Sequence, residues 1–230
     1  MMEVSFIEIY CEKVRDLLGD FGSGNGGKSK RGAPPPDHKI VRNDQGANVV
    51  SNVAMIPVNP SDVSKLADLM EIAGRARATK KTDMNETSSR SHSVFTLHLS
   101  AENRRLGAVS HGQLNLCDLA GSERIERSGA KGVALTEAKN INKSLSALAH
   151  VFESLSKNTS HVPYRDSTLT YLLEPALSGN GKTLMIINLS PTEQSLQESL
   201  SALRFGAKVN QVELGKPKKN LDTMKKKSGS

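Results

Sequence analysis

The chain has 230 residues, of which 37% are hydrophobic, so it is long enough for one large domain with a buried core. It contains no apolar run of about 18 residues and opens without a basic, apolar leader, so we expect neither a membrane span nor a signal peptide. Its net charge of +7 is unevenly distributed along the chain. Residues 215–230 hold six Lys against one Asp (+5), and residues 21–39 hold three Lys and one Arg against one Asp (+3). The remaining residues therefore carry a net charge of −1.

Basic residues thus gather in two segments of low complexity. Residues 19–38 are rich in Gly, Ser and Lys, and we expect a disordered basic insertion there; residues 215–230 read as a basic flexible tail. This distribution argues against a nucleic-acid-binding face, but it suits other polyanions, including an acidic protein filament. Cys11 and Cys117 lie in strand-like runs and are expected to be buried free thiols of a reducing cytosol.

The first half of the chain predicts strands and one helix. Residues 4–10 carry apolar side chains on both faces, as a central strand does. Residues 93–100 and 113–119 read as two strands of an antiparallel hairpin that turns at 104–107. Between the first strand and this hairpin, a helix is expected to begin at an N-cap, Ser61, and to fray near Thr79. Its apolar face would hold Val63, Leu66, Leu69, Met70 and Ala73.

The second half predicts two helices and a strand. Residues 139–156 show helical spacing of apolar side chains, as do residues 193–210, and the continuous apolar run 184–189 is typical of a buried strand. The two apolar faces would hold Ile141, Leu145, Leu148, Phe152 and Leu155 in one helix, and Leu196, Leu200, Leu203 and Ala207 in the other. Strands mixed with helices indicate the α/β class with a mixed sheet.

Polar side chains that suit phosphate chemistry lie next to two of these strands. Asp118 and Gly121 form a D-x-x-G arrangement at a strand end, where the carboxylate can hold Mg²⁺ through water and the glycine amide can approach a phosphate. Alone, this pattern is weak and is more often an ordinary strand-end turn. The hydroxyls of Ser88 and Ser89 can reach a metal or phosphate, and Arg90 can pair with Glu123 in fork geometry.

Five strings in this order resemble the kinesin motor domain, and the resemblance covers about residues 2–214. They are NETSSRSH (85–92), LCDLAGSER (116–124), LTEAKNINKSLSAL (135–148), HVPYRDSTLT (161–170) and LRFGAKVNQVELGK (203–216). The last string resembles the C-terminal-motor, minus-end-directed subgroup.

The resemblance implies a kinesin-like P-loop NTPase fold, with a mixed, mostly parallel central sheet covered by helices on both faces. It also implies an ATPase that uses ATP and Mg²⁺ and moves on microtubules in the cytoplasm. Tubulin is then the expected partner, with a second kinesin chain or a coiled-coil partner as a further one; neither nucleic acid nor a membrane is expected.

The resemblance also assigns residues. It implies nucleotide contacts at Asn85, Ser88, Ser89 and Asp118, with Ser89 and, through water, Asp118 on Mg²⁺. Gly121 would sense the γ-phosphate, and Arg90 with Glu123 would form a catalytic latch. Microtubule contacts are implied for Arg124, Arg127, Lys131, Lys139, Lys143, His161, Tyr164 and Arg165. From spacing alone, Lys139 and Lys143 are more simply read as a solvated helix face.

The chain departs from the family pattern at several points. It starts at the family's mid-domain strand, so we expect the first third of the domain, with its Walker A loop, to be absent. Residues 179–183 only end like a Walker A motif, since Ala176 stands where the first glycine is required, and we read them as a turn. Thr168 stands where the family usually has Lys, which would remove one cationic track contact.

Two functional hypotheses therefore stand side by side. One is an ATPase motor represented by an incomplete chain, and the other is a microtubule-binding module that does not hydrolyse ATP, because the phosphate-holding loop is missing from this chain. A third alternative, a small switch GTPase, is disfavoured, because such proteins also need a P-loop and lack a helix like that predicted over 139–156.

Overall fold

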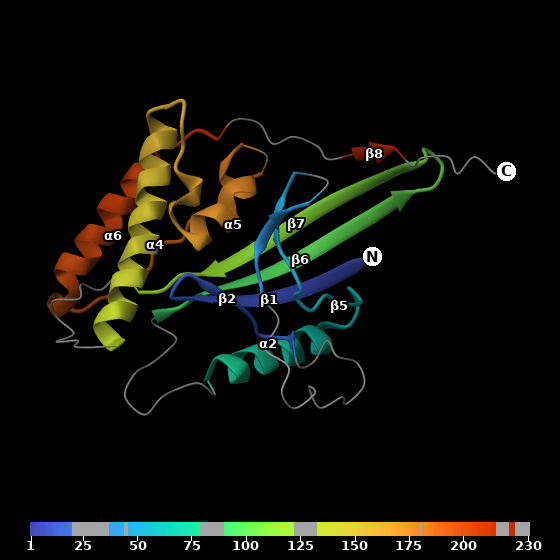
Figure 1. Cartoon of the computed structure of the whole chain (residues 1–230), viewed down its shortest axis with the longest axis horizontal. Helices are drawn as coiled ribbons and strands as arrows, with labels where there is room; N and C mark the ends of the chain where they lie inside the picture. Colours follow the sequence, from blue (N-terminus) through green and yellow to red (C-terminus); the bar gives the residue numbers. More distant parts are fainter. Residues whose placement is uncertain are drawn as a thin grey trace.

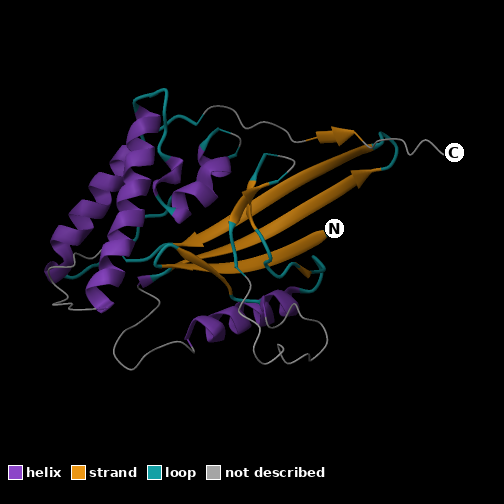
Figure 2. Ribbon diagram, viewed as in Figure 1, coloured by secondary structure: helices purple, strands orange, loops and turns teal. Residues whose placement is uncertain are grey.

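The structure is a computed structural model that describes residues 1–19, 37–43, 46–78, 90–121, 133–179, 181–214 and 221–223. Figures 1 and 2 show a twisted sheet with α2 (Val63–Ala78) below it and with α4 (Val133–Ser156), α5 (Thr168–Leu177) and α6 (Leu196–Val209) above it. The α/β class predicted from the sequence is confirmed.

Three long strands form the middle of the sheet: β1 (Met2–Tyr10), β6 (His92–Asn103) and β7 (Ala108–Asp118). The strand order is β2-β1-β6-β7-β8, with β2 at Lys13–Asp16, β8 at Leu221–Thr223, and β5 (Ile56–Pro57) also paired with β1. A separate pair joins β3 (Ile40–Arg42) to β4 (Asn48–Val50).

Every strand pair in the described part of the chain is antiparallel, so the mostly parallel sheet implied by the resemblance is not what these strands form. Tight turns explain this for β1 with β2 and for β6 with β7, because a short connection can only join antiparallel neighbours. Cys11 and Glu12, both at positive φ, turn β1 into β2, and the predicted hairpin turns at 104–107, where Gly107 has φ of 58°.

Strand β1 buries both of its faces, as expected for residues 4–10. Val4 and Phe6 pack toward α2 (Val63–Ala78), and the ring of Phe6 meets the edge of Phe95 at 5.7 Å. Ile7 and Ile9 point to the other face, against α4 (Val133–Ser156) and α5 (Thr168–Leu177). Helices therefore cover both faces, as predicted.

The helix predicted near 61–79 is confirmed as α2, but its start and its face differ. Asp62, not Ser61, caps it, since its Oδ1 accepts from the amide of Lys65 at 3.0 Å. Of the predicted apolar face, Leu69 and Ala73 are buried and Leu66 packs against the core, whereas Val63 and Met70 are exposed. The helix predicted over 139–156 is confirmed within α4, and Leu148 and Phe152 are buried as expected.

The buried strand predicted over 184–189 is wrong. These residues form no strand in the described structure, and the side chains of Leu184 and Ile186 are 84% and 75% exposed. An apolar run becomes a buried strand only with neighbours on its edges and faces, which the described strands do not supply. Residues 111–118 of β7 likewise pair only with β6 in the described part, and Leu114 and Leu116 are exposed.

The last predicted helix is confirmed as a short 3₁₀ turn (η3, Glu193–Ser195) followed by α6 (Leu196–Val209), but its face is rotated. Leu196, Leu203 and Ala207 are exposed, while Phe205 and Val209 pack on the core beside α4. The ring of Phe205 lies 5.9 Å from that of Phe152, edge to face. The helix turns this way because burying the large ring of Phe205 removes more apolar area from water than burying Leu203 or Ala207 would.

Three further predictions meet the structure only in part. Residues 20–36 of the basic insertion lie outside the described residues, but His38 at its end contacts the carbonyl of Ser51. Within the expected flexible tail, Leu221–Thr223 instead pair with Ala108–Ser110, since the edge of β7 offers unpaired backbone groups there. Both cysteines are free thiols, but Cys117 is exposed, because it lies on the uncovered stretch of β7.

Candidate functional site

The two segments predicted to sense nucleotide lie on neighbouring strands. Arg90 comes just before β6 and Asp118 ends β7, and the register pairs Ser93 with Asp118. Gly121 follows three residues after Asp118 and is partly buried. The other predicted members of this site lie outside the described residues: Asn85, Ser88, Ser89 and Glu123. The arrangement of Arg90 with Glu123 therefore stays a prediction.

Asp118 is held by an arginine that belongs to none of the five sequence motifs. Nη1 of Arg77, in the last turn of α2, lies 3.0 Å from Oδ2 of Asp118. The Asp118 side chain is 71% exposed, whereas that of Arg77 is only 16% exposed. The aspartate thus stands at the surface, oriented from behind by a largely buried cation.

The same arginine belongs to a buried ionic cluster around Glu8. The Glu8 side chain is fully buried in β1, and Arg15 Nη1 lies 2.8 Å from its Oε2. Ser91 Oγ donates to Glu8 Oε1 at 2.8 Å, and Arg77 Nε lies 3.7 Å from the same oxygen. One signal could have revealed Glu8, since a carboxylate in the middle of an apolar central strand requires a charged partner. Nothing in the sequence pointed to Arg77 as that partner.

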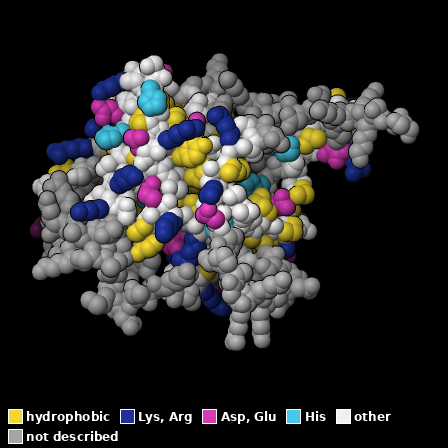
Figure 3. All heavy atoms as spheres, in the orientation of Figure 1, with side chains coloured by type: hydrophobic (Ala, Val, Ile, Leu, Met, Phe, Trp, Pro, Cys, Tyr) yellow, Lys and Arg dark blue, Asp and Glu magenta, His cyan; other side chains and the backbone are white. Residues whose placement is uncertain are grey.

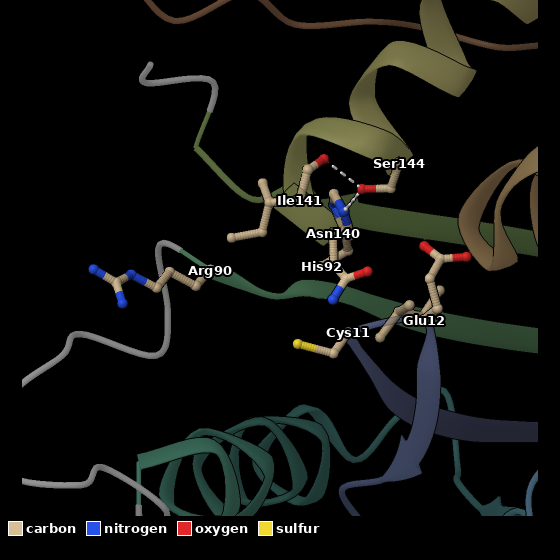
Figure 4. A pocket seen from close by; sticks show the side chains of 8 residues that line it. Cys11, Glu12, Arg90, His92, Asn140, Ile141 and Ser144 are labelled. Atoms are coloured by element: carbon tan, nitrogen blue, oxygen red, sulfur yellow. Dashed lines mark hydrogen bonds between the residues drawn. The ribbon is translucent and has the colours of Figure 1, made fainter. Parts of the chain in front are cut away.

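His92 joins the start of β6 to the end of β7 and to α4. Its Nδ1 accepts from the amide of Ala120 at 3.0 Å, and its Nε2 lies 2.7 Å from Ser144 Oγ on α4. Burial lowers the pKa of His92 to about 4, with nearby Arg77 acting in the same direction and Asp118 opposing it. The imidazole is therefore neutral at physiological pH. Figure 4 shows His92 pointing to Ser144, while Arg90 points away from both.

The residues predicted to contact microtubules lie around α4 and the turn before α5. Lys139, Lys143, His161 and Arg165 are exposed. A groove of about 680 Å³ is lined by both charge signs, with the cations in slight excess: Lys13, Lys39, Lys143 and Arg165 against Glu12, Asp37 and Asp166. In Figure 3, Lys and Arg side chains spread over the surface formed by the helices above the sheet. Arg124, Arg127 and Lys131 lie outside the described residues.

Two side chains in this region make contacts within the chain. The hydroxyl of Tyr164 donates to the carbonyl of Leu177 at 3.3 Å, and burial raises the pKa of this phenol. Thr168 faces Glu12, whose Oε2 accepts from the Thr168 amide at 2.8 Å. Thr168, predicted to lack the cationic track contact of the family's usual lysine, thus makes its contacts inside the fold.

The segment that ends like a Walker A motif follows a helix, α5, and is followed by residues without regular secondary structure, whereas a P-loop follows a strand and opens a helix. Gly179 has φ of 86°, and a Cβ there would lie 2.6 Å from the Leu214 carbonyl oxygen. Glycine is thus required by a close backbone approach, which supports the interpretation as a turn.

The donor set fits a hydrated Mg²⁺ better than a tightly ligated metal. Among the described residues, no three His, Cys, Asp or Glu side chains gather as a metal cluster would need. A single exposed carboxylate, that of Asp118, suits an ion that keeps several of its waters. In the same described part, no helix combines the length and apolar character needed to cross a bilayer.

Comparison with known proteins gives consistent matches. The family described as kinesin motor domain matches residues 1–212. Kinesin-like protein KIN-14C of Arabidopsis thaliana is 44% identical over 224 residues, which are 96% of this chain and 28% of that protein.

Two solved structures are similar in fold. One is the C-terminal motor and motor homology domain of Kar3Vik1 fused to a synthetic heterodimeric coiled coil (39% identity, TM-score 0.73, 91% of this chain and 51% of that one). The other is a KIF14 dimer with AMP-PNP in complex with a microtubule (35% identity, TM-score 0.80, 95% and 60%). This chain spans little more than a quarter of the plant relative and about half to three-fifths of these motor chains. By its sequence and by its fold, the chain belongs to the kinesin motor domain family, and it is similar to KIN-14 and Kar3 motors within that family.

Proposed function

We propose that this chain is the nucleotide-sensing and track-binding part of an ATPase motor that works on microtubules of the cytoplasmic cytoskeleton. One observation carries the proposal: Ala120, two residues after Asp118, is hydrogen-bonded through His92 to α4. The nucleotide-sensing end of the sheet is therefore in direct contact with the helix on which Lys139 and Lys143 are exposed.

The roles at the sheet end follow from chemistry. Asp118 would hold Mg²⁺ through water, together with Ser89, and the ion would offset phosphate charge as the γ-phosphoryl group is transferred. Arg77 keeps the Asp118 carboxylate at this edge. Asn85 and Ser88 would contact the nucleotide, the Gly121 amide would contact the γ-phosphate, and Arg90 would close against Glu123 to place the attacking water.

The track-binding role rests on exposed positive charge. Lys143 and Arg165 line the same groove, and Lys139 is exposed one helical turn before Lys143. Cations on one face attract an acidic filament and strengthen encounters at low salt. His161, Tyr164, Arg124, Arg127 and Lys131 belong to the same proposed surface. A microtubule and AMP-PNP bound to the KIF14 neighbour support this assignment.

The test is ATP turnover and microtubule co-sedimentation of the full-length protein. We expect turnover to rise with microtubules, and Lys143→Glu to raise the microtubule concentration needed for half-maximal stimulation severalfold. Arg105→Glu reverses an exposed charge at the tip of the β6–β7 hairpin, far from α4 in Figure 1, and should change neither value. Microtubule binding without turnover would favour the non-hydrolysing module, and no binding would overturn both hypotheses.

A further inference from the structure

Two strand edges that have no neighbouring strand in the described part of the chain line the groove of about 680 Å³. Strand β2 is the last strand on its side of the main sheet, and β3 pairs only with β4 among the described strands. Val14 of β2 and Ile40 of β3 both belong to the groove lining. Such an edge presents backbone groups with which a further extended chain can pair.

The pairing pattern fixes which backbone groups of these edges point outward. In antiparallel pairs, residues that exchange hydrogen bonds alternate with residues whose N–H and C=O are directed away from the partner strand. The Leu17 amide donates to β1 at 2.8 Å, and Val14, an odd number of positions away, therefore belongs to the outward set of β2. The Ser51 amide donates to the Lys39 carbonyl at 2.8 Å, so the next residue, Ile40, belongs to the outward set of β3.

The groove also carries positive charge that has no internal partner. Three exposed cations line it without a carboxylate at ion-pair distance among the described residues: Lys13, Lys143 and Arg165. Asp37 pairs with Lys39 at 2.9 Å, and Oε2 of Glu12 already accepts from the Thr168 amide at 2.8 Å. Asp166 is the remaining carboxylate among the described lining residues. The groove therefore favours a negatively charged occupant.

We propose that this groove is a docking site for an extended, acidic segment of a partner protein, which adds a strand to the free edge of β2. In this mode main-chain hydrogen bonds supply affinity, and the cations select the sequence. A lysine on an edge strand discourages pairing with other chains, but an acidic segment neutralises Lys13. The 230 residues supply no such segment, because no two acidic residues are adjacent and both low-complexity segments are basic.

The docked segment should exclude the track. Lys143 and Arg165 line the groove and also belong to the proposed microtubule surface, so one occupant covers charges that the other needs. This competition rests on the proposed function, whereas binding of the segment does not.

The first test asks whether the backbone edge is used. A fluorescent peptide of alternating Glu and Val is titrated with the full-length protein, and its anisotropy is followed. Val14→Pro removes the outward amide, which an edge strand tolerates, and should weaken binding about fivefold, the value of one hydrogen bond. Val14→Ala trims the same side chain but keeps the amide, and should retain the affinity. The same peptide N-methylated at every amide keeps its charge but cannot donate, and should bind much more weakly.

The second test asks whether the cations select the peptide. Lys13→Glu should weaken binding severalfold at low salt and less at high salt, while Arg105→Glu, the same reversal at the β6–β7 hairpin tip, should have no effect. Microtubules should displace the bound peptide. Equal affinity for the N-methylated peptide, or a protein that binds microtubules but not the peptide, would overturn the inference. Microtubules that bind without displacing the peptide would instead overturn the proposed track surface.

Discussion

Arg77 and Asp118 are 41 residues apart in the chain, yet Nη1 of the arginine lies 3.0 Å from Oδ2 of the aspartate. The same guanidinium lies 3.7 Å from buried Glu8 and donates to the Ser91 carbonyl at 3.0 Å. One side chain of α2 therefore connects a carboxylate inside the sheet to the carboxylate proposed to hold Mg²⁺. A planar guanidinium can serve several acceptors at once, which a lysine cannot do in the same geometry.

Arg77→Ala should destabilise the fold, because it takes a cation from a cluster whose carboxylate cannot reach water. We expect the free energy of unfolding to fall by about 2 kcal/mol, below the usual range for breaking a buried pair, since Arg15 still neutralises Glu8. Urea unfolding followed by circular dichroism measures this change. Arg75→Ala, on the same helix but 75% exposed, should cost little, and equal losses in the two variants would show that the cluster is not responsible.

Stability should fall on acidification because of His92. Its pKa is about 4 in the folded chain and 6.5 in the unfolded chain, so the unfolded state binds more protons between these values. The contribution of His92 to the free energy of unfolding is complete above pH 6.5 and is lost as the pH falls toward 4. Between pH 7.5 and pH 5 this loss is about 2 kcal/mol. Burial also lowers the pKa of His98, so His98 adds its own pH dependence. The contribution of His92 is therefore the difference between wild type and His92→Gln in the free energy of unfolding lost from pH 7.5 to pH 5. A parallel pH dependence in wild type and variant would contradict the assignment.

The parts of the fold that depend on local pattern could be predicted from the sequence. The hairpin of β6 and β7 follows from alternation and a turn, and α4 follows from its apolar spacing. Predictions failed where a partner decides the outcome. Residues 184–189 have the composition of a buried strand, but composition does not say whether neighbouring strands cover it. For the same reason Met70 and Leu203 seemed buried until the packing was known.

The candidate site shows the same division. Asp118, Gly121 and Arg90 could be nominated as candidates because phosphate chemistry depends on short-range spacing, and their roles stay predictions. Arg77 could not, since its role arises from a contact across 41 residues that no local pattern records. His92 was visible only as the last letter of a polar string, and its link to Ser144 spans 52 residues.

Glu12 should stabilise the start of α5. Its Oε2 accepts from the amide of Thr168, the first residue of that helix, and its carbonyl accepts from the Thr168 hydroxyl at 2.9 Å. Glu12→Ala loses the side-chain acceptor and should cost about 1 kcal/mol, as the loss of a helix cap does. Glu12→Gln retains a side-chain acceptor oxygen on a residue whose backbone φ is 62°, and it should lower the free energy of unfolding by less. Equal urea midpoints for the two variants would contradict the capping role.

The isolated chain should self-associate through its uncovered apolar residues. Leu116 on the open stretch of β7 is 53% exposed and Ile186 is 75% exposed, and an open strand edge with apolar side chains pairs readily with other chains. We expect Leu116→Ser with Ile186→Ser to shift sedimentation toward the monomer. Leu106→Ser changes a 66% exposed residue at the hairpin turn and serves as control. A wild-type chain that sediments as a monomer at high concentration would refute this expectation.

The 230-residue chain alone should show no microtubule-stimulated ATP turnover. Transfer of a γ-phosphoryl group depends on a loop of backbone amides and a lysine that hold the phosphates, and this sequence contains no G-x-x-x-x-G-K-[ST] string. Asp118 and Gly121 provide only the part that responds to a phosphate already held. In the full-length protein, turnover is expected and Glu123→Ala should abolish it. The decisive comparison is phosphate release by both proteins at saturating microtubules. Turnover by the chain alone that Glu123→Ala removes would mean that other residues, inside these 230, hold the phosphates.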